Sequence, residues 1–96
     1  MKIEVATFGK FRGFVGGEVA LELEARTVTV RDALNALCNQ FGEGFESILF
    51  DPATKEIKRS NLVLVNGQSY INLPGRLDSE LEDGDKIALG PVLVGG

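Results

Sequence analysis

The sequence predicts one α+β domain in which four to five strands form a mixed sheet covered by one main α-helix. Two segments with alternating apolar and polar residues open the chain, and a segment with helical periodicity follows at 30–41. Further short strand-like segments come after it. Strands grouped on both sides of a single helix favour α+β over repeated βαβ units. A length of 96 residues is typical of one domain.

The first two predicted strands cover residues 2–8 and 19–24. In each, apolar and charged side chains alternate with a period of two, which is typical of a strand with one buried face. In the second strand, Val19, Leu21 and Leu23 share that face. A helix crosses between the first and the last strand, so these two can pair in parallel.

The helix is predicted by a change of period from 2 to 3.6. Thr29 is a good N-cap, and Asp32 three residues later completes a pattern that resembles a capping box. Gly42 and Gly44 can end the helix. One apolar stripe faces the core and consists of Val30, Ala33, Leu34, Leu37, Cys38 and Phe41.

The second half of the chain reads as shorter elements. Residues 43–61 predict a short helical turn followed by a solvent-facing hairpin or loop. The apolar run 62–65 predicts a central strand buried on both faces. Asn66-Gly67 is a strong signal for a type I′ hairpin. The other expected elements are a return strand at 68–71, turns at 73–75 and 83–85, and a last strand at 86–89.

Composition excludes several kinds of chemistry. The chain has no His, and Cys38 is its only cysteine. A zinc site of His and Cys ligands, an internal disulfide and His-dependent nucleophilic catalysis are therefore ruled out. We expect Cys38 to be a small buried hydrophobic residue.

Charge and hydropathy bear on location and partners. With 10 basic and 14 acidic residues the net charge is −4, which disfavours nucleic acid as a partner. No apolar run approaches the ~18 residues of a membrane span, and no signal-peptide core follows Met1. A lone cysteine without an export signal fits the cytoplasm.

The segment 90–96 is the most unusual part of the chain. Glycine is over-represented at 12 of 96 residues, and two glycines stand together at the end of the sequence after three apolar residues. One explanation is a last edge strand that folds back, or the remnant of a tag. The other is a tail, residues 91–96, that leaves a domain of residues 1–90 and delivers the Gly96 carboxylate to a partner. Six extended residues beyond Gly90 span roughly 20 Å, and a carboxylate needs activation, usually by adenylation with ATP.

Five segments resemble the MoaD/ThiS group of ubiquitin-like sulfur carriers, which includes the small archaeal modifier proteins. The resemblance covers nearly the whole chain and rests on its ordered set of motifs rather than on any one of them. The matching segments are 5–16 (first strand and Arg-containing loop), 29–34 (capped helix start), 65–67 (hairpin), 81–89 (the Leu-x-Asp-Gly-Asp stretch and last strand) and 90–96 (tail).

The resemblance implies a ubiquitin-like β-grasp fold with a flexible C-terminal tail. It further implies that an activating enzyme adenylates Gly96, and that a sulfurtransferase supplies sulfur to form a thiocarboxylate for molybdopterin or tRNA thiolation. Pro91, Val92, Leu93, Val94 and Gly95 would thread the tail into the partner. ATP would be used by the activating enzyme, with no cofactor bound to this chain. The protein would be a cosubstrate rather than an enzyme, or the small subunit of a molybdopterin synthase beside its large subunit.

Two other functions remain open at this stage. The first is a protein modifier that forms an isopeptide between Gly96 and lysines of target proteins, an activity that can coexist with sulfur transfer. The second is a non-covalent binding module with an unmodified tail. Both would use the same tail as the sulfur carrier.

A few further residues have both a functional and a plain structural interpretation. Phe8, Phe11 and Arg12 are candidates for a partner surface, although core burial explains at least one aromatic ring and a surface ion pair explains the arginine equally well. Lys55 and Lys58 are candidate conjugation acceptors or simply solvated loop charges. Asp83 and Asp85, on either side of Gly84, are better explained as turn residues than as metal ligands.

Overall fold

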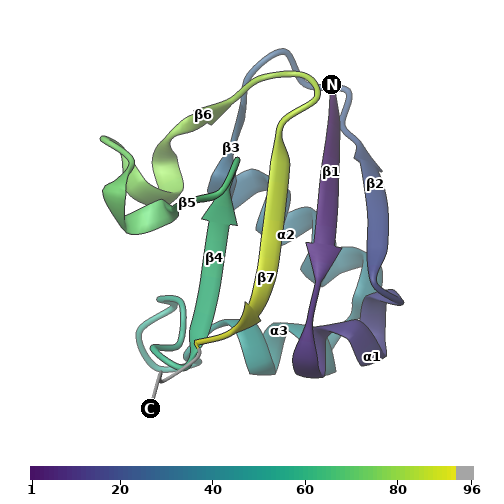
Figure 1. Cartoon of the computed structure of the whole chain (residues 1–96), viewed down its shortest axis with the longest axis vertical. Coiled ribbons are helices and arrows are strands. Elements are labelled where there is room, and N and C mark those ends of the chain that lie inside the picture. The colour runs from purple at the N-terminus through teal and green to yellow at the C-terminus, as the bar shows by residue number, and fades with distance from the viewer. Residues whose placement is uncertain (93–96) are drawn as a thin grey trace.

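The computed structural model describes residues 1–92, and its central feature is a five-stranded sheet with the strand order β2-β1-β7-β4-β5 (Figure 1). β1 and β7 pair in parallel, as predicted for the first and last strands, and the other neighbours are antiparallel. The sheet is therefore mixed, which confirms the α+β prediction. Its strands are β1 (Lys2–Thr7), β2 (Glu18–Glu22), β4 (Asn61–Val65), β5 (Gln68–Ser69) and β7 (Lys86–Pro91).

The helices lie together on one face of this sheet (Figure 1). The predicted main helix is α2 (Val30–Phe41), preceded by the capping box: the Thr29 hydroxyl accepts from the Asp32 N–H at 3.1 Å, and the Asp32 carboxylate accepts from the Thr29 N–H at 3.0 Å. α3 (Glu43–Leu49) follows after Gly42, and the short α1 (Arg12–Val15) completes the layer. All of the predicted stripe is buried except Phe41, which is half-buried.

Strand register decides which side chains meet the helices. Val5, Ile87 and Val65 lie side by side across β1, β7 and β4, and all three are buried. The next residues along these strands point to the opposite face because side chains alternate. That face carries Ala6, Ala88 and Leu64 in one row, all of them only half-buried. The sheet thus has one covered face and one open face.

The open face corrects the prediction for residues 62–65. Val63 and Val65 are buried, but Leu62 and Leu64 are only half-buried. The helices cover a single face, so a central strand here is buried on one side alone. The apolar run carries leucines on the open face, where no helix of residues 1–92 covers them.

The other elements agree in part with expectation. α3 and a turn closed by an isolated Phe50–Ile57 bridge form the predicted helical turn and hairpin. Asn66 and Gly67 have φ angles of 52° and 85°, which confirms the type I′ hairpin. The return strand ends at Ser69, whose hydroxyl accepts from the Ile71 N–H and starts a 3₁₀ turn, Tyr70–Asn72.

Several short elements were not predicted. β3 (Val28–Thr29) and β6 (Glu80–Leu81) form a separate two-stranded sheet. Two more 3₁₀ turns cover Gly9–Phe11 and Arg76–Asp78. Elements of two or three residues carry no periodicity of their own, so sequence patterns do not detect them.

The last strand is longer than predicted, because it continues from Lys86 through Pro91 instead of ending at Leu89. A proline in a paired strand is tolerated where its missing N–H has no partner to meet. The Val92 N–H donates to the Ser60 carbonyl on the β4 side at 2.9 Å. By alternation the Pro91 nitrogen faces the other side, where β1 has already ended at Thr7. No sheet hydrogen bond is lost.

Candidate functional site

The candidate site begins at the end of β7, where the chain leaves the sheet. On one side β7 is fastened by β4, since Pro91 pairs with Asn61 and the Val92 N–H donates to the Ser60 carbonyl. The chain is therefore held as far as Val92. The sequence assigns residues 91 and 92 to the tail, but both are held beside β4. Residues 91 and 92 belong to the folded domain.

On the other side the dipeptide Phe8-Gly9 packs closely against the same stretch of β7. The Phe8 N–H donates to the Leu89 carbonyl at 2.8 Å. A Cβ atom on Gly90 would come within 3.2 Å of the Phe8 Cβ, and one on Gly9 within 2.9 Å of the Pro91 Cδ. Gly9 also has a φ of +61°, a conformation that favours glycine. We call Phe8, Gly9, Gly90 and Pro91 the clasp.

An apolar groove of about 250 Å³ opens on the sheet beside the clasp. Phe8 forms one wall, with 56% of its surface exposed, although a phenylalanine is usually buried. Val92, 40% exposed, follows directly after the groove residue Pro91. Exposed apolar surface beside a strand end is typical of a protein interaction site. The groove is lined by Phe8, Gly9, Leu62, Leu64, Ala88, Leu89, Gly90 and Pro91.

The three phenylalanines of the first loop have different environments. Phe8 is exposed, and its role on a partner surface stays a prediction. Phe11 is 2% exposed and its ring packs edge-on against Phe45, with centroids 5.6 Å apart, so the expectation that Phe11 lies on a partner surface is wrong. The 3₁₀ turn over Gly9–Phe11 directs this ring into the core. Phe14 is 42% exposed and also contacts Phe45.

The candidate basic residues are spread over two loops. Arg12 begins α1, is exposed, and makes no ion pair within residues 1–92. Lys55 is exposed at the tip of the 51–55 turn, with a φ of 63°. Lys58 is half-buried and lies two residues before Ser60, the residue that receives the Val92 N–H. Their roles toward a partner stay predictions.

Four residues of the predicted tail lie outside the described residues: Leu93, Val94, Gly95 and Gly96. Pro91 and Val92 are described and belong to the clasp and its border. The candidate site therefore consists of the clasp, Val92 and the groove, all described by the structure. The sequence adds the four residues 93–96.

Other polar groups of the domain have structural roles. The Asp83 carboxylate accepts from the Lys2 N–H and the Asp85 carboxylate from the Glu82 N–H, both at 2.7 Å, as turn residues do. Burial, and secondarily the Glu46 carboxylate, raises the pKa of the Cys38 thiol to about 11. The thiol is therefore protonated at neutral pH and a poor nucleophile.

Residues 1–92 contain neither a candidate metal site nor a candidate membrane-spanning helix. No group of three or more acidic or cysteine side chains is placed to hold a metal ion there. None of the helices described has the length and hydropathy needed to cross a bilayer.

Comparison with known sequences identifies the family. The sequence model of the ThiS family matches residues 5–96, nearly the whole chain. The chain belongs to the ThiS family. This is a family of ubiquitin-like sulfur carriers and modifiers, small carrier proteins that are not enzymes themselves. A search of curated proteins finds no match.

Solved structures similar to this ThiS-family protein match nearly its whole length. Small archaeal modifier protein 1 from Haloferax volcanii is 28% identical with a TM-score of 0.80, and each chain is covered to 100%. The protein of the same name from Methanosarcina acetivorans is 25% identical with a TM-score of 0.79, covering 99% of this chain and 96% of that one. A candidate molybdopterin converting factor subunit 1 from Pyrococcus furiosus is 27% identical with a TM-score of 0.72, covering 95% and 97%. These similarities confirm the ubiquitin-like β-grasp fold.

Sequence reasoning missed part of the site. Leu62, Leu64 and Ala88 line the groove, but the apolar run 62–65 predicts a strand buried on both faces. A usable signal was present: with only one main helix predicted, a single sheet face could be covered. Gly9 was also missed, because its importance comes from contact with Pro91, far away in the sequence.

Proposed function

We propose that this ThiS-family protein is a sulfur carrier whose Gly96 carboxyl group is adenylated and then converted to a thiocarboxylate. The observation that carries the proposal is the family match, which extends through Gly95 and Gly96. The clasp and the groove support it, because the clasp holds the chain at Gly90 and Pro91 and the groove offers an adjacent contact surface for a partner.

The chemistry explains why the chain needs a partner. A carboxylate is a poor acyl donor, since its oxygen is a poor leaving group. Attack of a Gly96 carboxylate oxygen on the α-phosphorus of ATP forms an acyl-adenylate and releases pyrophosphate. A persulfide sulfur held by a sulfurtransferase then attacks the acyl carbon, and AMP leaves with its bonding electron pair. A second thiol attacks the enzyme sulfur of the acyl disulfide that forms, which releases the Gly96 thiocarboxylate and leaves a disulfide behind. An activating enzyme supplies the ATP site, and this chain supplies the substrate carboxylate.

The domain contributes positioning. Val92 is held at the end of β7, and extended residues beyond it span at most roughly 3.6 Å each. Four such residues reach about 14 Å, less than the roughly 20 Å expected from a tail that begins after Gly90. The reacting centre of the activating enzyme would therefore lie close to the surface formed by the clasp and the groove.

Two acceptors fit the carrier proposal. The candidate molybdopterin converting factor subunit among the similar structures favours molybdopterin, with the large subunit of a molybdopterin synthase as the partner. tRNA thiolation is the alternative. In both cases a thiocarboxylate on Gly96 would be the sulfur donor, so the activation step is the same.

A protein modifier is the second candidate function. It is favoured by similarity to small archaeal modifier protein 1 over the full length of the chain. A lysine amine of a target would attack the activated Gly96 carbonyl, displace AMP and leave an isopeptide. Lys55 and Lys58 would be acceptors if one copy modified another.

Intact-mass spectrometry tests these proposals. The full chain is incubated with an activating enzyme, ATP, a persulfide donor and a thiol reductant, and a deletion of Gly95 and Gly96 serves as the control. A mass gain equal to one sulfur replacing one oxygen, absent from the deletion variant, supports the carrier. Heavier conjugates that disappear with the deletion support the modifier. If neither the sulfur exchange nor the conjugates appear, both proposals are refuted and a non-covalent binding module remains.

A further inference from the structure

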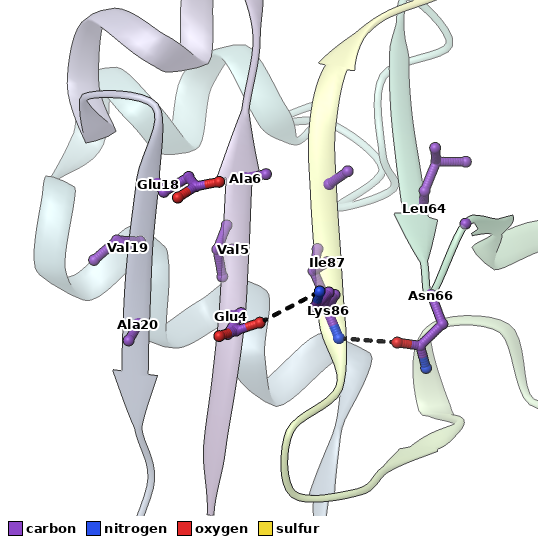
Figure 2. A pocket seen from close by; sticks show the side chains of 12 residues that line it. Glu4, Val5, Ala6, Glu18, Val19, Ala20, Leu64, Asn66, Lys86 and Ile87 are labelled. Atoms are coloured by element: carbon purple, nitrogen blue, oxygen red, sulfur yellow. Dashed lines mark hydrogen bonds and ion pairs between the residues drawn. The ribbon is translucent and has the colours of Figure 1, made fainter.

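The open face of the sheet carries a second depression, larger than the groove. This hollow has a volume of about 640 Å³ and extends over β2, β1, β7 and β4 (Figure 2). Its floor contains Ala6, Ala20 and Ala88, and alanine is depleted in strands because its small side chain packs weakly. Three alanines on neighbouring strands lower the surface and create the hollow.

The rim of the hollow carries two carboxylates and one ammonium group. The Lys86 ammonium lies 3.8 Å from the Glu4 carboxylate, an exposed pair that partly neutralises itself. Glu18 also lines the hollow, and no cation lies within 4.0 Å of its carboxylate among residues 1–92. Figure 2 shows the Glu18 side chain directed from β2 toward β1 and Ala6, its neighbour in register. The hollow therefore presents one uncompensated negative charge above an apolar floor.

This arrangement has the shape and chemistry to receive an arginine side chain. The aliphatic stem of an arginine can lie on alanine methyl groups while its charged end stays at the rim. The guanidinium can then form a bidentate pair with a carboxylate. A lysine would make a single-point contact, so the hollow fits arginine better.

The groove and the hollow are continuous, because Leu64 and Ala88 line both. Ala88 on β7 and Glu18 on β2 both pair with Ala6 on β1, so they lie two strand spacings apart, or about 10 Å. We propose that the activating enzyme docks on this face with an apolar side chain in the groove and an arginine in the hollow, paired with Glu18. The inference rests on the proposed function, since an enzyme that receives Gly96 must cover the surface beside the clasp.

The test compares two charge reversals on the same strand and face. Glu18→Lys changes the hollow, whereas Glu22→Lys makes the same change outside it, opposite Lys2 at the far end of β2. Affinity of the full chain for the activating enzyme of the same organism is measured without ATP, at low and high salt. We expect Glu18→Lys to weaken binding by about tenfold or more and Glu22→Lys by less than about twofold. Circular dichroism checks that both variants are folded.

Two further measurements sharpen the result. Ala6→Leu fills the floor without touching the covered face, and it should weaken binding by a similar factor. In adenylation assays over a range of carrier concentrations, Glu18→Lys should show a raised KM. Its kcat should be unchanged, because the substitution affects docking and not Gly96.

The outcomes separate this inference from the function on which it rests. Equal effects of Glu18→Lys and Glu22→Lys would overturn the inference in favour of a general electrostatic field, while adenylation of the wild type would still support the function. A wild-type chain that self-associates, in a way that Glu18→Lys abolishes while enzyme affinity stays intact, would overturn it in favour of a second copy as occupant. A wild-type chain that neither binds the enzyme nor is adenylated would refute both.

Discussion

Gly9→Ala is the most direct test of the clasp. The new Cβ would lie 2.9 Å from the Pro91 Cδ, closer than real Cβ contacts, and the proline ring cannot rotate away. Residue 9 also has a φ of +61°, which costs a residue with a side chain about 1–2 kcal/mol. Overpacking adds about 1–3 kcal/mol. We expect the free energy of unfolding to fall by about 2–5 kcal/mol.

Gly16→Ala is the matched control. Gly16 has a φ of +87° in the same loop, but no atom lies within 4 Å of the position of its missing Cβ. Only the conformational penalty of about 1–2 kcal/mol applies there. The difference between the two variants therefore isolates the contact with Pro91.

The assay is thermal and urea unfolding followed by circular dichroism. For a domain of this size 1 kcal/mol corresponds to about 4–8 °C in Tm, so Gly9→Ala should melt at least about 4 °C below Gly16→Ala. Under the proposed function Gly9→Ala should also be adenylated more slowly, because the root of the tail is displaced. Equal melting temperatures and equal adenylation rates for the two variants would refute the clasp.

Three further predictions concern the core and the groove. Phe11→Ala should lose about 3–5 kcal/mol of stability, whereas Phe8→Ala should lose much less and instead weaken partner binding; calorimetry and affinity measurements separate the two. Thr29→Ala should cost about 1 kcal/mol in urea unfolding through loss of the capping box. Because the pKa of the Cys38 thiol is raised, its contribution to stability is complete below pH 9 and is lost as pH rises toward 11. Cys38→Ala should flatten this alkaline decline in urea titrations, and an unchanged decline would contradict the assignment.

Local signals in the sequence were sufficient for the framework of the fold. The stripe on α2, the Thr29 cap and the Asn66-Gly67 turn each depend on residues close in the chain, and all three are confirmed. The parallel pairing of β1 with β7 followed from the helix that crosses between them. In these cases one local physical rule selects one conformation.

The contacts that build the site join distant residues, and periodicity does not reveal them. Gly9 matters because of Pro91, and Phe8 because of Gly90, so neither could be recognised within its own segment. Phe11 and Phe8 are three residues apart in one loop, yet a 3₁₀ turn sends one into the core and leaves the other exposed. The sequence predicts too early an end for β7 for a related reason: whether proline is tolerated in a strand depends on which neighbour its nitrogen faces.

The position of β7 in the sheet has a consequence for folding. β7 is the last described strand along the chain, but it lies between β1 and β4 and joins the two sides of the sheet. Glu4 pairs with Lys86 across most of the length of the chain, and such non-local contacts form slowly because a long loop must close first. The sheet is therefore completed only after β7 has been synthesised. A chain that lacks β7 cannot form the clasp, so a formed clasp is evidence that the domain is complete.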